Sequence, residues 1–267
     1  MADLAFIFRA DKNNVGDWWS IPQRYFTFRP ADTFDIKNIN ANLSNYKSII
    51  VGGGGLGRPG FQTELNYLQN NGKNIIGWGI GADTFENSRK ILTPPPLNYD
   101  FTANYFDAFD VVGTRIFNLS GSTYVPCASC MSNLFFKYRD MKPKHTLGLY
   151  SHPKAYLTPP NTASPIPHND NKGNNLEEKL QFLASCETVV TNTYHGVYWS
   201  LLLERKVVCI PFKSGLFTFK HKPVYADSTN ITDSLIAKAT TYSGLLEECR
   251  KLNIMFYSDI ANNFEVA

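Results

Sequence analysis

The sequence predicts an α/β fold in which two Rossmann-like domains face each other over a cleft. Three observations lead to this prediction. Short apolar runs alternate with helix-like segments, a glycine-rich turn joins one such run to a helix, and the whole pattern restarts after a polar break. Strand, turn, helix and strand in this order are typical of the βαβ unit, which builds parallel sheets covered by helices on both faces.

The first half of the chain contains four apolar runs that are typical of buried strands. These runs are residues 4–8, 48–51, 75–78 and 109–112. A helix is predicted at 61–68, because Phe61, Leu65 and Leu68 recur there at helical spacing. We therefore expect a first Rossmann-like domain over residues 1–141.

The second half repeats the pattern after residues 138–144, which are polar and include a proline. Strands are predicted at 146–150, 188–191 and 206–210, and helices at 177–185 and 196–203. Residues 158–175 are rich in Pro, Asn and Gly, which favours a surface loop. We expect a second Rossmann-like domain over residues 142–267, with a last helix at 242–264 that packs back on the first domain.

Charge and composition exclude several classes of protein. A net charge of +3 without any run of like charges argues against a nucleic-acid partner. The N-terminus lacks the basic segment and long apolar run of a signal peptide, and no stretch approaches the roughly 18–20 apolar residues of a membrane helix. The 5 cysteines, an odd number, are typical of free thiols in a reducing compartment. We expect a cytoplasmic protein without an integral membrane segment.

Asn14, Gly16 and Asp17 follow the first predicted strand and lead into a helix. Backbone N–H groups at a helix N-terminus bind anions. Asp17 suits the N-cap position, and it also suits a role in binding a ligand. The spacing leaves both interpretations open.

A glycine-rich turn spans residues 52–57 and includes Gly53, Gly54 and Gly55. Its spacing satisfies a Gly-x-Gly-x-x-Gly pattern, but no acidic residue for a ribose and no phosphate-loop lysine accompany it. So many glycines favour close approach of the backbone to a ligand or to the other domain.

Arg115 lies at the end of the predicted strand at 109–112, after Gly113 and Thr114. Ligands bind at this edge of such sheets. Its planar guanidinium suits a carboxylate or a phosphate. An interdomain salt bridge is the alternative.

Cys127 and Cys130 form a single Cys-x-x-Cys. No second pair completes a zinc site and no thioredoxin-like context surrounds them, so we expect packed thiols beside the interdomain hinge and no metal.

The most informative turn contains Thr193, Tyr194, His195 and Gly196, between a predicted strand and a helix. An imidazole at the carboxyl end of a strand can donate a hydrogen bond to an anion or act as general acid or base. Gly196 lets a ligand approach. We expect His195 to be near the centre of a functional site.

In the order of these motifs the chain resembles the polysaccharide pyruvyl transferase family. The matching motifs are Asn-x-Gly-Asp at 14–17, the glycine-rich turn at 52–57, a strand ending in Arg115, Pro-Cys-x-Ser at 126–129, and Tyr-His-Gly at 194–196. The resemblance extends over nearly the whole chain.

The resemblance implies a fold like that of the B-type glycosyltransferases, and transfer of pyruvate from phosphoenolpyruvate to a sugar hydroxyl as a ketal, in the biosynthesis of surface polysaccharides. His195, Arg115 and Asp17 would be the catalytic residues. Asn14, Gly16, Gly53, Gly54, Gly55, Thr193, Tyr194 and Gly196 would bind substrate. Phosphoenolpyruvate would be a donor substrate and no cofactor would be needed. The partner would be a glycan or glycolipid acceptor.

One position departs from the family. Thr193 stands where the family commonly has an arginine shortly before the Tyr-His-Gly turn. Lys213, Lys220, Lys222 or His152 are candidates to replace that charge. Two alternatives stay open: a B-type glycosyltransferase that uses a nucleotide sugar, and a non-catalytic relative that binds glycans or nucleotides.

Overall fold

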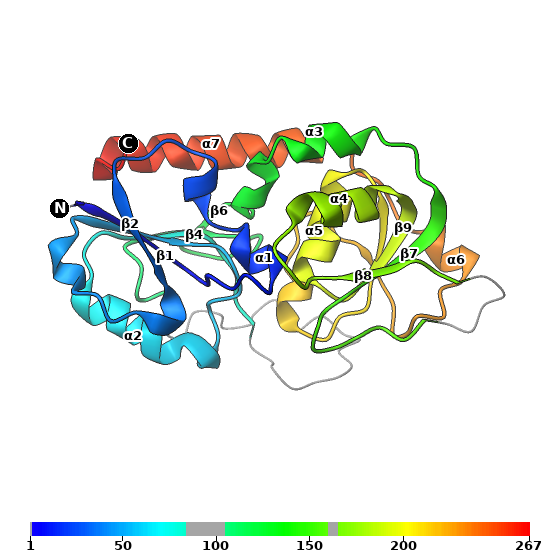
Figure 1. The fold of residues 1–267 in the computed structure, drawn as a ribbon, viewed down its shortest axis with the longest axis horizontal. Helices are drawn as coiled ribbons and strands as arrows, with labels where there is room; N and C mark the ends of the chain where they lie inside the picture. The colour runs from blue at the N-terminus through cyan, green and yellow to red at the C-terminus, as the bar shows by residue number, and fades with distance from the viewer. Residues whose placement is uncertain (1, 84–104, 160–164) are drawn as a thin grey trace.

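The chain forms two parallel β-sheets that lie side by side, each flanked by helices (Figure 1). The computed structural model describes residues 2–83, 105–159 and 165–267. The predicted fold class, two Rossmann-like α/β units, is confirmed. None of the helices in the described ranges has the length and apolar composition that crossing a bilayer takes.

The first sheet has the strand order β2-β1-β3-β4-β5-β6, and every neighbouring pair is parallel. Its strands are β1 (Leu4–Phe8), β2 (Ala31–Asp35), β3 (Ser48–Gly52), β4 (Ile75–Ile80), β5 (Val111–Thr114) and β6 (Thr123–Tyr124). Its helices are α1 (Val15–Trp18) after β1 and α2 (Gln62–Asn71) after β3. Helix α3 (Leu134–Arg139) leads to the second sheet.

The second sheet has the order β11-β10-β9-β7-β8, and it is also parallel throughout. Its strands are β7 (His145–Ser151), β8 (His168–Asp170), β9 (Cys186–Thr191), β10 (Lys206–Cys209) and β11 (Val224–Tyr225). Its helices are α4 (Leu176–Ala184), α5 (Tyr194–Leu202) and α6 (Asp233–Ile236). The C-terminal helix is α7 (Leu245–Phe264).

The apolar, buried inner strands lie where the sequence predicts them. The four edge strands of the two sheets are not predicted. β6 and β11 have only 2 residues each, and β8 has 3. β2 is polar and partly exposed along its length. Such strands form because a neighbouring strand supplies hydrogen-bonding partners, and they have no hydrophobic pattern of their own.

Most predicted elements shift by one to three residues at an end, and three segments show what decides the observed bounds. The strand expected at 109–112 begins at Val111, since Phe109 still belongs to a turn in which its N–H donates to the Phe106 carbonyl oxygen (3.0 Å). The segment 158–175 is not wholly loop, since β8 pairs with β7 inside it, and its residues 160–164 lie outside the described ranges. The last helix begins at Leu245, after Gly244 with φ +75°.

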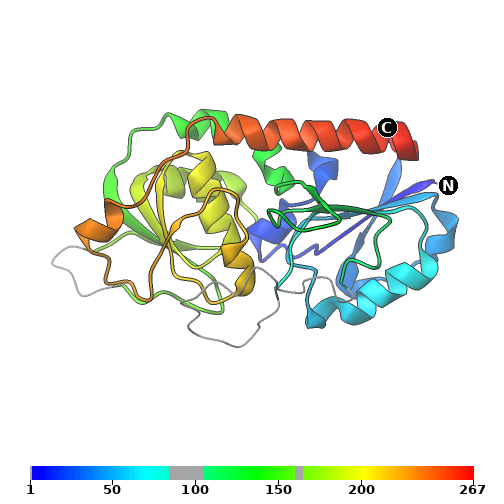
Figure 2. The ribbon, with the colours of Figure 1, turned by 180° about the vertical axis from the view of Figure 1, so that it is seen from behind.

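Helix α7 packs against both halves of the molecule, and Figure 2 shows it running along one side of the first sheet. Leu245, Leu246 and Cys249 belong to the hydrophobic cluster around α4, β9 and α5. Further along α7, Phe256 and Ile260 belong to the cluster beneath β1, β3 and β4. Side chains of one helix therefore enter both cores.

A fully buried polar contact fixes α7 against the first sheet. Asn253 accepts a hydrogen bond from Trp78 Nε1 (2.8 Å) and donates to the carbonyl oxygen of Pro126 (3.2 Å). Replacing Asn253 with Leu leaves both partners buried without a hydrogen bond, which costs about 2 kcal/mol.

We expect Asn253→Leu to lower the melting temperature by about 5 °C, measured by circular dichroism. Asn262→Leu is the matched control, because Asn262 is an exposed asparagine of the same helix. Equal melting temperatures for the two variants would contradict a stabilising role for the Asn253 contacts.

Candidate active site

A cavity of about 720 Å³ lies between the two sheets, and its lining comes from both. The lining residues follow the carboxyl ends of β1, β2, β3, β4 and β5 in the first sheet, and of β7, β8, β9 and β10 in the second. Ligands bind at this edge of parallel α/β sheets, because the loops there converge and expose backbone donors. Of the residues predicted for the site, Asn14, Asp17, Gly55, Arg115, Thr193, Tyr194 and His195 line the cavity.

Asn14, and not Asp17, caps helix α1. The Asn14 Oδ1 atom accepts hydrogen bonds from the N–H groups of Gly16 (3.1 Å) and Asp17 (3.4 Å), so the interpretation of Asp17 as the N-cap was wrong. Asn14 Nδ2 donates to the Asp17 carboxylate (2.9 Å). The cap leaves Asp17 one turn into the helix, with its carboxylate at the cavity wall.

Burial raises the pKa of Asp17, while the positive charges of Arg115 and Arg58 oppose that rise. A carboxyl group with a raised pKa can hold and release a proton closer to neutral pH than an exposed aspartate can. Asp17 is therefore suited to proton transfer.

Gly53 and Gly54 shape the turn after β3, and they do not line the cavity. Their φ angles of +56° and +81° are in the left-handed region that favours glycine. A β-carbon at Gly54 would lie 3.2 Å from Asp17 Oδ1. The turn therefore packs against Asp17, and of these three glycines only Gly55 lies at the cavity, beside Asp83 and Arg115.

His195 lies in the first turn of α5, which Thr193 caps by accepting a hydrogen bond from the Gly196 N–H (2.7 Å). The Thr193 hydroxyl is thus committed to the helix. Only 4% of His195 is exposed, and its ring packs on Trp199 with 4.7 Å between centroids. A side chain at Gly16 would overlap the His195 ring, so this glycine is needed for α1 and α5 to meet. Burial, and then the charge of Arg115, hold the pKa of His195 well below its usual range.

Arg115 is 8% exposed, and its guanidinium lies 3.6 Å from the centroid of the Tyr194 ring. Cation–π stacking of this kind positions a guanidinium without neutralising its charge. Among the residues that the structure describes, no group accepts a hydrogen bond from Arg115 Nη1. The interdomain salt bridge considered for Arg115 is not formed within those ranges. Arg115 lines the same cavity as His195, near enough for its charge to lower the pKa of that histidine.

On the wall formed by the second sheet, His152 is neutral at physiological pH. Burial and the charges of Lys213 and Lys154 lower the pKa of His152 to about 4. Its Nδ1 atom accepts a hydrogen bond from the Lys154 N–H (3.1 Å), which places the ring proton on Nε2. Asn192 accepts a hydrogen bond from the His152 N–H (2.7 Å) and so fixes this loop.

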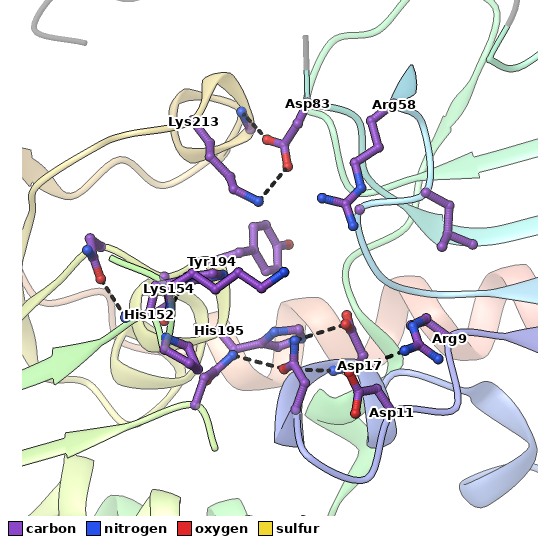
Figure 3. Close-up of a pocket in the computed structure, with 18 of the residues that line it drawn as sticks. Arg9, Asp11, Asp17, Arg58, Asp83, His152, Lys154, Tyr194, His195 and Lys213 are labelled. Carbon is purple, nitrogen blue, oxygen red and sulfur yellow. Dashed lines mark hydrogen bonds and ion pairs between the residues drawn. The ribbon is translucent and has the colours of Figure 1, made fainter. Parts of the chain in front are cut away.

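The cavity lining has a marked excess of positive charge. It contains 7 lysines and arginines against 3 aspartates: Arg9, Lys37, Arg58, Arg115, Lys154, Lys172 and Lys213 against Asp11, Asp17 and Asp83. Figure 3 shows Arg58, Lys154 and Lys213 pointing toward one another across the cavity, near the Tyr194 ring. Arg115 and Lys154 have no carboxylate partner within the described ranges. The cavity is therefore suited to an anion.

Hydrogen bonds between the two halves hold this cavity together. The loop after β8 contacts the start of α1, where Asn171 Nδ2 donates to Asn14 Oδ1 (3.2 Å) and Val15 N donates to the Asn171 carbonyl oxygen (3.1 Å). Across the cavity, Asp83 accepts a hydrogen bond from the Gly215 N–H (3.0 Å) and lies 3.7 Å from Lys213 Nζ.

Sequence reasoning missed several lining residues, among them Arg58, Asp83, Lys154 and Asn171. Arg58, Asp83 and Lys154 lie a few residues beyond the carboxyl ends of predicted strands, so a search of those positions for charged side chains would have listed them as candidates. Asn171 follows β8, which the sequence does not predict. Of the residues proposed to replace the missing arginine, Lys213 and His152 line the cavity. Lys220 and Lys222 do not, and Lys220 pairs with Glu248.

Cys127 and Cys130 are buried free thiols, as the sequence predicted. Cys127 Sγ lies 3.5 Å from His195 Nε2. Among the residues that are described, no group of three or more His, Cys, Asp or Glu side chains could hold a metal ion.

Comparisons with known proteins give a distant structural likeness. The chain is similar to the E. coli ADP-heptose lps heptosyltransferase II, with a TM-score of 0.33 and 13% identity over 95% of this chain and 99% of that chain. No protein-family model matches the sequence, and neither does any curated protein. A TM-score this low says nothing about activity, so the function has to be argued from the cavity.

The pKa of His152 provides a test of the cavity's electrostatics. We expect its imidazole to titrate near pH 4 in NMR spectra, assigned with His152→Gln. Because unfolded histidine binds its proton near pH 6.5, His152 makes the fold progressively less stable as the pH falls from about 6.5 to 4.

Lys213→Met removes one positive neighbour and should raise the pKa of His152, since the charged imidazole then meets less repulsion. Titration of His152 near its ordinary value in the unmodified chain would contradict the burial and charge described for this wall.

Proposed function

We propose that this protein transfers pyruvate from phosphoenolpyruvate to a sugar hydroxyl, forming a ketal on a glycan or glycolipid acceptor. The observation that carries the proposal is the buried Arg115 guanidinium, unpaired at Nη1 within the described ranges, which lines the same cation-rich cavity as His195. The order of motifs that resembles the pyruvyl transferase family supports the same reaction.

The charge distribution favours a small, highly charged donor. Phosphoenolpyruvate carries a carboxylate and a phosphate within a few atoms, so it needs several cations close together. Arg115, Arg58, Lys154 and Lys213 all line the one cavity. The pyruvyl transferase family commonly has an arginine at the position of Thr193. Lys154, after β7, and Lys213, after β10, supply positive charge in its place. A cavity of about 720 Å³ also has room for an acceptor sugar.

The residues have distinct roles in this reaction. The Arg115 guanidinium binds the donor's carboxylate or phosphate and withdraws charge from C2. The lowered pKa keeps His195 neutral before an anion binds, so its ring is a poor general acid. Its role is instead to donate a hydrogen bond to the same anion. Asp17, with a raised pKa, delivers or accepts the proton.

The reaction balances with two acceptor hydroxyls. A proton adds to C3 of the donor as the first hydroxyl oxygen bonds to C2, and that hydroxyl loses its proton. The second hydroxyl then displaces phosphate from C2, giving its proton to the departing group. The products are the pyruvate ketal and inorganic phosphate.

The 5 free cysteines agree with a reducing, cytoplasmic setting for this step.

We expect calorimetry to detect phosphoenolpyruvate binding, and Arg115→Lys to weaken it about tenfold. Lysine keeps the charge but loses the planar fork and the stack on Tyr194. A tenfold loss of affinity corresponds to about 1.4 kcal/mol of binding free energy, which is close to the contribution of one charge-assisted hydrogen bond. Lys206→Met is the charge-removing control, because Lys206 pairs with Glu187 outside the cavity.

The proposal fails if the unmodified chain binds a nucleotide sugar and not phosphoenolpyruvate. The fold would then serve a B-type glycosyltransferase, and the cations would bind a diphosphate. It also fails if Arg115→Lys and Lys206→Met bind phosphoenolpyruvate equally well. Release of inorganic phosphate in the presence of a candidate acceptor would extend the test from binding to transfer.

A further inference from the structure

A chain of buried hydrogen bonds leads from α5 to the inner edge of the His195 ring. Trp199 Nε1 lies 2.9 Å from Ser129 Oγ, and Ser129 Oγ lies 3.2 Å from Cys127 Sγ. Cys127 Sγ in turn lies 3.5 Å from His195 Nε2. Trp199, Ser129 and Cys127 are fully buried, so no solvent competes for these contacts.

The chemistry of these groups gives the chain a direction. An indole N–H can only donate, so the Ser129 oxygen accepts from Trp199 and its own proton goes to the Cys127 sulfur. Burial raises the pKa of the Cys127 thiol, so the sulfur keeps its proton at neutral pH. Within this series of hydrogen bonds, the S–H has an acceptor when it donates to His195 Nε2.

An imidazole that accepts at Nε2 carries its proton on Nδ1 when it is neutral. Nε2 faces Cys127, which lies outside the cavity lining, whereas His195 itself lines the cavity. The Gly16 backbone packs on the ring around Nδ1, and no described group forms a hydrogen bond with Nδ1. Nδ1 is thus the ring nitrogen that is left to form a hydrogen bond with a ligand.

We propose that Cys127 and Ser129 are positioning residues that hold neutral His195 as the Nδ1–H tautomer, and so present an N–H donor beside the Arg115 guanidinium to an anion in the cavity. This gives a role to the Pro-Cys-x-Ser segment at 126–129, which the proposed reaction does not otherwise use. The tautomer does not depend on the identity of the donor substrate; only the affinity measurement below rests on the proposed function.

The test is the ¹⁵N NMR spectrum of the full chain labelled at histidine, at neutral pH. We expect Nδ1 of His195 to resonate as a protonated nitrogen and Nε2 as an unprotonated one. Cys127→Ala removes the donor to Nε2 and should move the proton to Nε2. Cys127→Ser retains an O–H donor and should keep the Nδ1–H tautomer. Cys130→Ala is the matched control, because that thiol is buried in the same turn and has no contact with His195.

A proton on Nε2 in the unmodified chain would overturn the proposal, and this result needs no variant to fold. An unchanged tautomer in folded Cys127→Ala would overturn it as well. With phosphoenolpyruvate as the probe, we expect about tenfold weaker binding to Cys127→Ala and recovery in Cys127→Ser. If the unmodified chain binds no phosphoenolpyruvate, the proposed function fails while the spectra still decide the tautomer.

Discussion

The buried, incompletely bonded guanidinium of Arg115 is the constraint on which the rest of the candidate site depends. A guanidinium removed from water costs free energy unless its donors find acceptors, and each hydrogen bond to a charged group is worth about 1.5–3 kcal/mol. Stacking on Tyr194 offsets part of that cost. Burial is the main cause of the lowered pKa of His195 and of the raised pKa of Asp17, and the Arg115 charge adds to the first shift and opposes the second. One side chain therefore acts on both proposed catalytic partners.

This arrangement exists only because the two sheets are held at a fixed distance. Asn14 and Asn171 join the start of α1 to the loop after β8, and Asp83 joins the loop after β4 to the turn at Gly215. Side chains of α7 enter both cores. Gly16 has no side chain where the His195 ring lies, so the first domain can approach the second closely enough for Asp17 and His195 to share one cavity.

The sequence predicts the central strands and the strand-end motifs because both have local causes. A fully buried parallel strand must be apolar along its length, and the Tyr-His-Gly turn must lie where β9 ends and α5 begins. β6 and β11 could not be predicted, since 2 residues beside a neighbouring strand have no periodicity. Their positions after predicted strands make Lys154 and Arg58 candidates, but the sequence does not show which candidates share a cavity. Their importance comes from meeting across the cavity, which only the arrangement of the two sheets decides.

The most direct test of the central claim is a crystal structure of the chain with phosphoenolpyruvate. A carboxylate or phosphate oxygen should lie about 3 Å from a nitrogen of the Arg115 guanidinium, with a second oxygen of the ligand beside His195 Nδ1. A structure in which phosphoenolpyruvate binds outside this cavity, or in which it binds there without contacting the Arg115 guanidinium, would contradict the account.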